Sequence, residues 1–140
     1  MSVFLTGATG FIGSFVAQQL VERGHQVTCL VRKTSNLHWI ESLPLKFHMG
    51  SLTDPGSYEN ALKECEYVIH VAGVTKAFHE SGFYQGNVEA TEILLKTIEK
   101  LDLPLKRFLL VSSQAAVGPS PSAEPISEGH PCHPLTVYGK

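Results

Sequence analysis

Several features are scarce or missing in this 140-residue sequence, and each absence narrows its function. No run of basic residues occurs, and 11 lysines and arginines stand against 13 aspartates and glutamates, so electrostatic binding of nucleic acid has no support. No apolar stretch approaches the length that a membrane span needs, and the N-terminus lacks the basic and then apolar segments of a signal peptide. We therefore expect a cytoplasmic protein that binds neither nucleic acid nor a membrane.

Cysteine is also scarce, and its placement argues against disulfides and metal. Cys29, Cys65 and Cys132 are widely spaced and form no C-x-x-C pair, which fits free thiols in a reducing compartment. The only tight group of metal-ligand residue types is the segment 130–133, and its prolines favour an extended loop. Because structural zinc normally needs four ligands, we expect a polar loop there and no metal site.

What the sequence does contain is ordinary for one globular domain, with 43% hydrophobic and 17% charged residues. Short apolar runs predict strands at residues 3–5, 26–31, 45–49, 67–72 and 107–112. Helical spacing and start or stop signals predict helices from Phe11 to Gly24, from Asp54 onward, over 87–100 and, in short form, within 35–43. Residues 114–136, rich in Pro, Ser and Gly, are expected to form a long loop.

This alternation of strands and helices predicts the fold class. Several strands are nearly continuous apolar runs, which indicates parallel strands covered on both faces, the doubly wound α/β plan. No internal repeat or linker divides the chain. We therefore expect one domain over residues 1–140.

The loop after the first strand carries the most specific signal for function. Residues 6–13 read TGATGFIG, with glycines spaced G-x-x-G-x-x-G between a predicted strand and a predicted helix. In dinucleotide-binding folds the first glycine permits a tight turn, the second lets the backbone approach a pyrophosphate, and the third lets the helix pack closely. Backbone N–H groups at the helix start then face the phosphates. The predicted binding residues of the loop are Gly7, Thr9, Gly10, Phe11, Ile12 and Gly13.

The TGATGFIG loop and four later segments resemble, in order, the motifs of the extended short-chain dehydrogenase/reductase superfamily of NAD(P)-dependent epimerases, dehydratases and reductases. The later segments are IHVAG (69–73), NVEAT (87–91), VSS (111–113), and PISE (125–128) followed by YGK (138–140). One departure is Ala90, which replaces a glycine of the family's pattern. The resemblance implies a Rossmann-like parallel sheet in the order 3-2-1-4-5, NAD(P) as the cofactor and hydride transfer at an alcohol or carbonyl carbon.

The end of the second strand bears on the choice between NAD and NADP. An acidic residue there binds the ribose 2′-OH of NAD, whereas an arginine suits the 2′-phosphate of NADP. Arg32 and Lys33 occupy this position and no acid is present, so we predict NADP(H), with NAD as the alternative. Ser51 and Leu52 resemble the family's adenine-contacting pair, although Ser51 replaces an acid. By position in the family, further cofactor contacts are expected from Ala72, Gly73, Val74, Asn87 and Ser112.

The resemblance also implies a general acid/base tyrosine, assisted by a lysine four residues later on the same helical face. The lysine ammonium lowers the tyrosine pKa from its ordinary value of about 10. Tyr138 fits the tyrosine, and Ser113 is expected to hydrogen-bond the substrate oxygen, with Ser112 and Gln114 as alternatives. The lysine would fall at position 142, beyond Lys140, which at two residues from the tyrosine would point to the other side of a helix.

We therefore expect the cofactor-binding N-terminal portion of a larger enzyme, inactive or nearly so on its own, without the region that binds a small-molecule substrate. The fifth strand would be an exposed sheet edge. A homodimer of the complete enzyme is one prospect that the resemblance raises. An alternative hypothesis is a non-catalytic NADP(H)-sensing or regulatory module of the same fold. In both cases His70 is interpreted as a hydrogen-bonded strand residue and Lys76 as an exposed loop residue.

Overall fold

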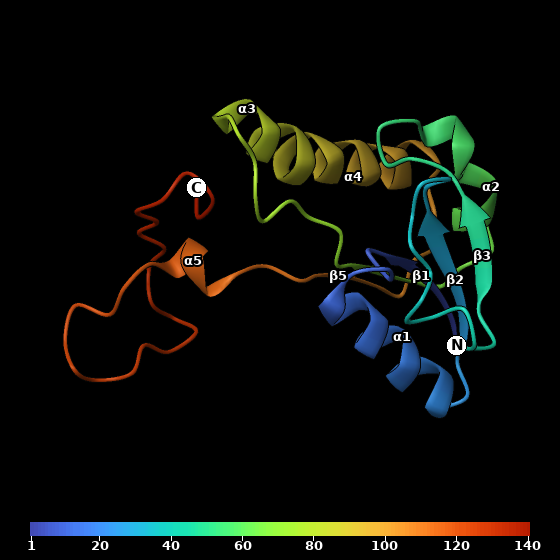
Figure 1. Ribbon diagram of the computed structural model, residues 1–140, viewed down its shortest axis with the longest axis horizontal. Coiled ribbons are helices and arrows are strands. Elements are labelled where there is room, and N and C mark those ends of the chain that lie inside the picture. Colours follow the sequence, from blue (N-terminus) through green and yellow to red (C-terminus); the bar gives the residue numbers. More distant parts are fainter.

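The computed structural model describes residues 1–140 and contains a five-stranded sheet in which every pairing is parallel. The strands are β1 (Ser2–Thr6), β2 (Gln26–Val31), β3 (Lys46–Met49), β4 (Tyr67–His70) and β5 (Arg107–Leu110). Their order across the sheet, β3-β2-β1-β4-β5, confirms the predicted topology (Figure 1). Strands β4 and β5 end before the predicted limits at residues 72 and 112.

Helices connect the strands, with three differences from expectation. The helical elements are α1 (Phe11–Glu22), the 3-10 turn η1 (Pro55–Ser57), α2 (Glu59–Lys63), α3 (Glu80–Phe83), the π-helical η2 (Tyr84–Glu89), α4 (Ala90–Lys100) and α5 (Gln114–Val117). Helical backbone before α4 begins at residue 80 instead of 87, residues 35–43 form turns, and the helix start at 54 yields only a 3-10 turn. None of the helices combines the length and apolar character needed to cross a membrane.

Local hydrogen bonds explain two of these differences. The Asn36 side chain accepts a bond from the His38 N–H at 2.9 Å, and such side-chain bonds compete with helix formation. The Ser57 hydroxyl donates to the Asp54 carbonyl at 2.6 Å, which holds this segment in a turn, while the Asp54 side chain makes no cap. Both segments therefore satisfy their backbone locally instead of extending a helix.

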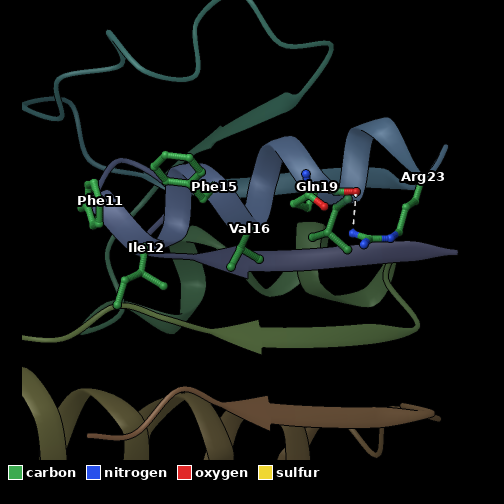
Figure 2. Close-up of a pocket in the computed structure, with 7 residues that line it drawn as sticks. Phe11, Ile12, Phe15, Val16, Gln19 and Arg23 are labelled. Carbon is green, nitrogen blue, oxygen red and sulfur yellow. Dashed lines mark hydrogen bonds between the residues drawn. The ribbon is translucent and has the colours of Figure 1, made fainter.

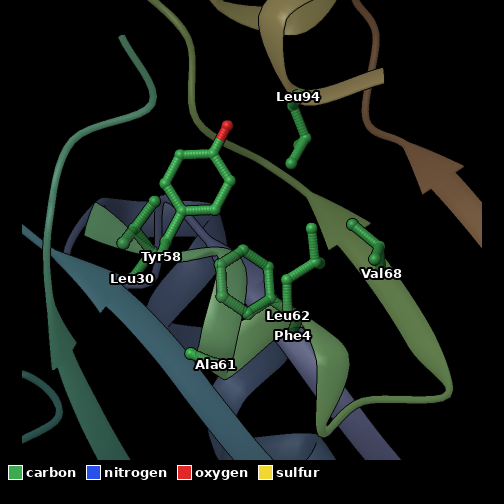
Figure 3. Packing of buried hydrophobic residues seen from close by; sticks show 7 residues of the cluster. All are labelled: Phe4, Leu30, Tyr58, Ala61, Leu62, Val68 and Leu94. Atoms are coloured by element: carbon green, nitrogen blue, oxygen red, sulfur yellow. The ribbon is translucent and has the colours of Figure 1, made fainter. Parts of the chain in front are cut away.

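Side chains alternate between the two faces of the sheet, and each face builds its own core. The face beneath α2 and α4 buries Phe4, Leu30, Tyr58, Ala61, Leu62, Val68 and Leu94 (Figure 3). The face beneath α1 and the turns over 35–43 buries Leu5, Ala8, Ala17, Val27, Cys29, Val31 and Ile40. These two cores cover both faces of the sheet and leave its carboxyl edge free of the core.

Helix α1 fully buries only small residues, while its large apolar side chains are exposed or half-buried. Its buried positions are Gly13, Ser14 and Ala17, and these allow a close approach of the helix to the strand. The predicted apolar stripe instead lines an open groove, formed by Phe11, Ile12, Phe15, Val16, Gln19, Leu20 and Arg23 (Figure 2). The apolar residues thus predicted the helix, and Val16 and Leu20 pack against the core beneath it, but Phe11, Ile12 and Phe15 are exposed.

Residues 111–140 form an arm that leaves the sheet after β5 (Figure 1). The predicted loop contains one short helix, α5, and the arm folds back on it. The Val117 carbonyl accepts the His133 N–H at 2.9 Å, and Gly118, with a φ of +83°, has no room for a Cβ beside the same His133 backbone. Gly139 likewise packs against the Ala115 carbonyl. The end of the described chain is therefore anchored on α5.

Candidate functional site

The carboxyl ends of parallel strands meet at one edge of a sheet, and this edge is where doubly wound folds bind ligands. The structure brings the predicted site segments to this edge. They are the glycine loop after β1, residues 32–33 after β2, 51–52 after β3, 72–74 after β4 and 112–113 after β5. Segments far apart in the sequence therefore surround one candidate site.

Two of the three loop glycines are required by packing within the chain. Gly7 has a φ of +75°, and a Cβ there would lie 2.5 Å from the backbone nitrogen of Ala72. A Cβ on Gly13 would overlap the carbonyl of Gly7. Gly10 has a φ of −86°, and the atom nearest to its Cβ would be the Gly7 oxygen at 3.4 Å. Packing does not demand glycine at position 10, which fits a surface kept open for a ligand.

The start of α1 presents unused hydrogen-bond donors. Gly10 supplies no side-chain cap, and the N–H groups of Phe11, Ile12 and Gly13 have no acceptor within the chain. The dipole of this 12-residue helix adds partial positive charge at the same place. Oxygens that carry negative charge and accept several hydrogen bonds, such as those of a pyrophosphate, fit these donors.

At the end of β2 two cations are exposed and form no ion pair, although four ion pairs occur elsewhere in the chain. The Arg32 N–H donates to the Ser35 hydroxyl at 3.0 Å, and the Ser35 N–H donates to the Arg32 carbonyl at 2.9 Å. The backbone of this turn is fixed while the guanidinium and the Lys33 ammonium remain available. A guanidinium in this state can bind a phosphate through two parallel hydrogen bonds.

At the end of β3 the two predicted adenine contacts are both engaged within the chain. The Ser51 hydroxyl lies 2.9 Å from the Thr53 hydroxyl, and the Ser51 N–H donates to the Ser57 hydroxyl at 3.0 Å. Leu52 packs against the core beneath α2 and α4. These contacts fix the shape of the turn, and direct contact of Ser51 or Leu52 with a cofactor stays a prediction.

At the end of β4 a side chain from another element clamps the loop. The Asn87 Oδ1 atom accepts the Val74 N–H at 2.6 Å, and the Asn87 Nδ2 atom donates to the Val74 carbonyl at 3.0 Å. Asn87 lies in the π-helical η2, and a Cβ on Gly86 in the same element would overlap the Val74 side chain. The unexpected π-helical stretch therefore brings this helix close to the loop. Contact of Ala72, Gly73 or Asn87 with a cofactor stays a prediction.

Two buried residues beneath this loop lie outside the predicted set of cofactor contacts. Thr6, at the end of β1, accepts the Ala72 N–H on its Oγ1 atom at 3.2 Å. His70, at the end of β4, has both ring nitrogens hydrogen-bonded, which agrees with its interpretation as a strand residue. Burial lowers the His70 pKa to about 4, so the ring is neutral at pH 7. In the sequence, the feature that could have pointed to these two residues is a polar residue at the end of each of two apolar strands.

The arm after β5 contains Ser113 and Tyr138, the two predicted catalytic residues. The Ser113 Oγ atom accepts the Ala115 N–H at 3.2 Å and so caps α5, which leaves the hydroxyl hydrogen able to donate elsewhere. Ser112 is exposed. The Tyr138 ring centre lies 6.0 Å from that of Phe83, and Tyr138 lies in a turn and not in a helix. Because the next residue packs against the Ala115 carbonyl, the turn lies beside the helix that Ser113 caps.

The cysteine, the histidines of the arm and Lys76 show no arrangement of a reactive or metal-binding site. Burial raises the pKa of the Cys29 thiol to about 12, so this cysteine is not a thiolate near neutral pH. The rings of His130 and His133 lie 6.4 Å apart in the arm, and no group of three or more metal-ligating side chains converges anywhere in the chain. Lys76 is exposed, as expected for a loop residue.

Comparison with known proteins accords with this geometry. The chain is 28% identical over 99% of its length to the sterol-4-alpha-carboxylate 3-dehydrogenase, decarboxylating, of Dictyostelium discoideum, and covers 43% of that protein. The crystal structure of gox2253 shares 33% identity with a TM-score of 0.88, and the Bordetella bronchiseptica enzyme WbmG in complex with NAD shares 25% identity with a TM-score of 0.82. Both alignments cover 99% of this chain, but only 43% and 46% of the two structures.

The chain thus spans less than half the length of these proteins, and its fold matches that of the two structures over 99% of its residues. The match to a family model extends over residues 3–140. The glycine loop, the strand order and the relatives agree on one assignment: the chain belongs to the NAD-dependent epimerase/dehydratase family.

Proposed function

We propose that residues 1–140 form one dinucleotide-binding domain of an NADP(H)-dependent oxidoreductase or epimerase/dehydratase. The observation that carries this proposal is the start of α1, where three consecutive N–H groups have no acceptor and the adjoining Gly10 leaves an open surface. These groups would hold the pyrophosphate, because they supply both donors and positive potential. Thr9 and the Ala72–Val74 loop would line the same cofactor.

The preference for NADP over NAD rests on the end of β2. Arg32 and Lys33 are exposed, carry no carboxylate partner and follow a strand that ends without an acid. A ribose 2′-phosphate would find two cations there, whereas a 2′-hydroxyl would find no carboxylate to accept its hydrogen bond. The charge of this turn therefore favours the phosphorylated cofactor.

The chemical role of the arm follows from Tyr138 and Ser113. When bound, the nicotinamide supplies or accepts a hydride at a carbon that bears an alcohol or carbonyl group. Tyr138 would then move the proton of that oxygen as general acid/base, and the hydroxyl hydrogen of Ser113 would orient the same oxygen. The Dictyostelium relative is more than twice as long as this chain. A small-molecule substrate and a homodimer are therefore proposed for the complete enzyme and not for residues 1–140 alone.

Titration of NADPH and of NADH into the purified chain tests the binding proposal. We expect quenching of intrinsic fluorescence and transfer to the reduced nicotinamide, saturating at lower concentration for NADPH than for NADH. Absence of binding by either cofactor at millimolar concentration contradicts the assignment of the glycine loop. A clear preference for NADH contradicts the assignment of Arg32 alone and leaves the loop assignment standing.

A non-catalytic NADP(H)-sensing module is the second candidate, and one observation favours it. The Ser113 oxygen already accepts the Ala115 N–H, and Tyr138 lies in a turn, so both groups have structural roles in the arm. In the longest natural form of the protein, the Tyr138→Phe variant separates the two functions. Loss of NADPH turnover with unchanged NADPH affinity supports catalysis, whereas no turnover in either form supports sensing.

A further inference from the structure

His70 is the one fully buried imidazole of the chain, and the chemistry proposed above does not use it. Its exposed fraction is 0%, and it lies at the end of β4. Its Nδ1 atom lies 2.6 Å from the Thr6 hydroxyl, and its Nε2 atom lies 3.0 Å from the Thr91 hydroxyl. The ring therefore links the last residue of β1 to helix α4.

The partners of these two hydroxyls determine which nitrogen carries the hydrogen. The Thr91 hydroxyl donates its hydrogen to the Asn87 carbonyl at 2.5 Å. Its oxygen can therefore only accept a hydrogen bond from the His70 ring, which means that the Nε2 atom carries the hydrogen. A neutral imidazole has one donor and one acceptor, which leaves Nδ1 to accept from the Thr6 hydroxyl. The lowered pKa of His70 is consistent with this neutral ring. The Thr6 oxygen in turn accepts the Ala72 N–H at 3.2 Å.

This hydrogen-bond chain ends at the two loops of the candidate site. Thr6 directly precedes Gly7, whose backbone abuts that of Ala72 so closely that a Cβ would lie 2.5 Å from the Ala72 nitrogen. At the other end, Asn87 clamps both backbone groups of Val74. The chain therefore connects the start of the glycine loop with the loop after β4 through a single buried ring.

We propose that His70 is a positioning residue of the dinucleotide site: it sets the spacing between the glycine loop and the Ala72–Val74 loop through Thr6 and Thr91. The proposal rests on the proposed function, because those two loops are its binding surfaces. An apolar side chain would fill the same volume without a desolvation cost, so the polar ring is better explained by its directional bonds. In enzymes a misplacement of about 1 Å can cost about a hundredfold in rate, so a small shift of these loops should also matter for the site.

Helix α4 offers a matched pair of variants for the test. Thr91 and Thr97 each donate to the carbonyl four residues earlier, at 2.5 Å and 2.7 Å, but only Thr91 contacts His70. Thr97 lies beside Tyr58 in the core beneath α2 and α4. We expect Thr91→Val to weaken NADPH binding at least tenfold and Thr97→Val to change it less than twofold, with Kd measured below the unfolding transition of each variant. Equal Kd values for the two variants overturn the proposal.

A conservative variant and two cofactor-independent measurements complete the design. Thr91→Ser keeps the hydroxyl and should restore Kd to within threefold of the wild type. Amide exchange at Ala72 and Val74 should quicken at least tenfold in Thr91→Val and not in Thr97→Val. If the wild type binds neither NADPH nor NADH, the proposed function fails, and amide exchange alone decides the positioning role. Nitrogen NMR of the wild-type ring should show the Nε2–H form, and the Nδ1–H form overturns the proposal even if no variant folds.

Discussion

The candidate site has two halves that are built in different ways. In the fixed half, around β1 and β4, Gly7 and Gly13 have no space for a Cβ, and Ala72 and Val74 are held by hydrogen bonds to other elements. In the exposed half, at the end of β2, the Arg32 side chain projects from a short turn without a carboxylate partner. Under the proposed function this difference would divide the roles: the fixed half would bind what all dinucleotides share, and the exposed half would distinguish their 2′ groups.

The largest expected effect comes from adding one methyl group to the fixed half. In Gly13→Ala the new Cβ would overlap the Gly7 carbonyl, which is backbone and cannot rotate away. We expect a loss of at least about 3 kcal/mol in the free energy of unfolding, at the upper end of the usual cost of overpacking. Chemical denaturation measures it. Gly129→Ala is the control, because nothing lies within 4 Å of its Cβ; equal stability of the two variants contradicts the close packing of the loop.

Acidification should lower the free energy of unfolding through His70, which lies in the fixed half. Its pKa is lowered from 6.5 to about 4 by burial, so the unfolded chain binds a proton below pH 6.5 that the folded chain refuses until about pH 4. The contribution of the neutral ring to the free energy of unfolding is therefore fully present above pH 6.5. It falls by about 1.4 kcal/mol per pH unit between pH 6.5 and about 4, on the order of 3 kcal/mol in total. Urea denaturation between pH 7 and 5 measures the slope. The same slope in His70→Gln contradicts its assignment to this ring.

Gly10 tests whether a position in the loop can matter for the ligand alone. A Cβ there meets nothing closer than 3.4 Å, so Gly10→Ala should change the free energy of unfolding by less than about 1 kcal/mol. If a pyrophosphate rests on this surface, the methyl group should weaken NADPH binding about thirtyfold, near 2 kcal/mol. Parallel denaturation and fluorescence titration separate the two effects. Unchanged affinity for NADPH places the pyrophosphate elsewhere.

The two halves also differ in how far the sequence could predict them. The strands and the glycine loop follow from local signals, apolar runs and glycine spacing, which act within a few residues, whereas the strand order is implied by the family resemblance. The links that hold the fixed half join residues distant in sequence, Thr6 to His70 across 64 positions and His70 to Thr91 across 21. No local pattern specifies such pairs, because they depend on how α4 packs against the sheet.

Local patterns also mislead where a close approach overrides them. The apolar stripe of α1 predicts its buried face, but the contact of Gly13 with Gly7 turns small residues toward the sheet and leaves Phe11 and Phe15 exposed. Helical backbone begins at Glu80 and not at residue 87 for a similar reason. The π-helical η2 packs against Val74, and this contact with a distant residue is not visible in the hydrophobic pattern of the segment. Tertiary packing decides both cases. The catalytic roles of Ser113 and Tyr138 remain predictions from resemblance.

The smallest expected effect, and the sharpest test of the division, lies in the exposed half. Arg32→Ala removes a side chain that contacts no carboxylate, so stability should stay within about 0.5 kcal/mol, as for other exposed positions. Affinity for NADPH should fall about fivefold, near 1 kcal/mol, while affinity for NADH stays within twofold. Arg23→Ala is the control, because Arg23 lies at the far end of α1 and donates only to the Gln19 carbonyl. If Arg32→Ala weakens both cofactors equally, the exposed half contributes general attraction and no selectivity, and the division of roles is wrong.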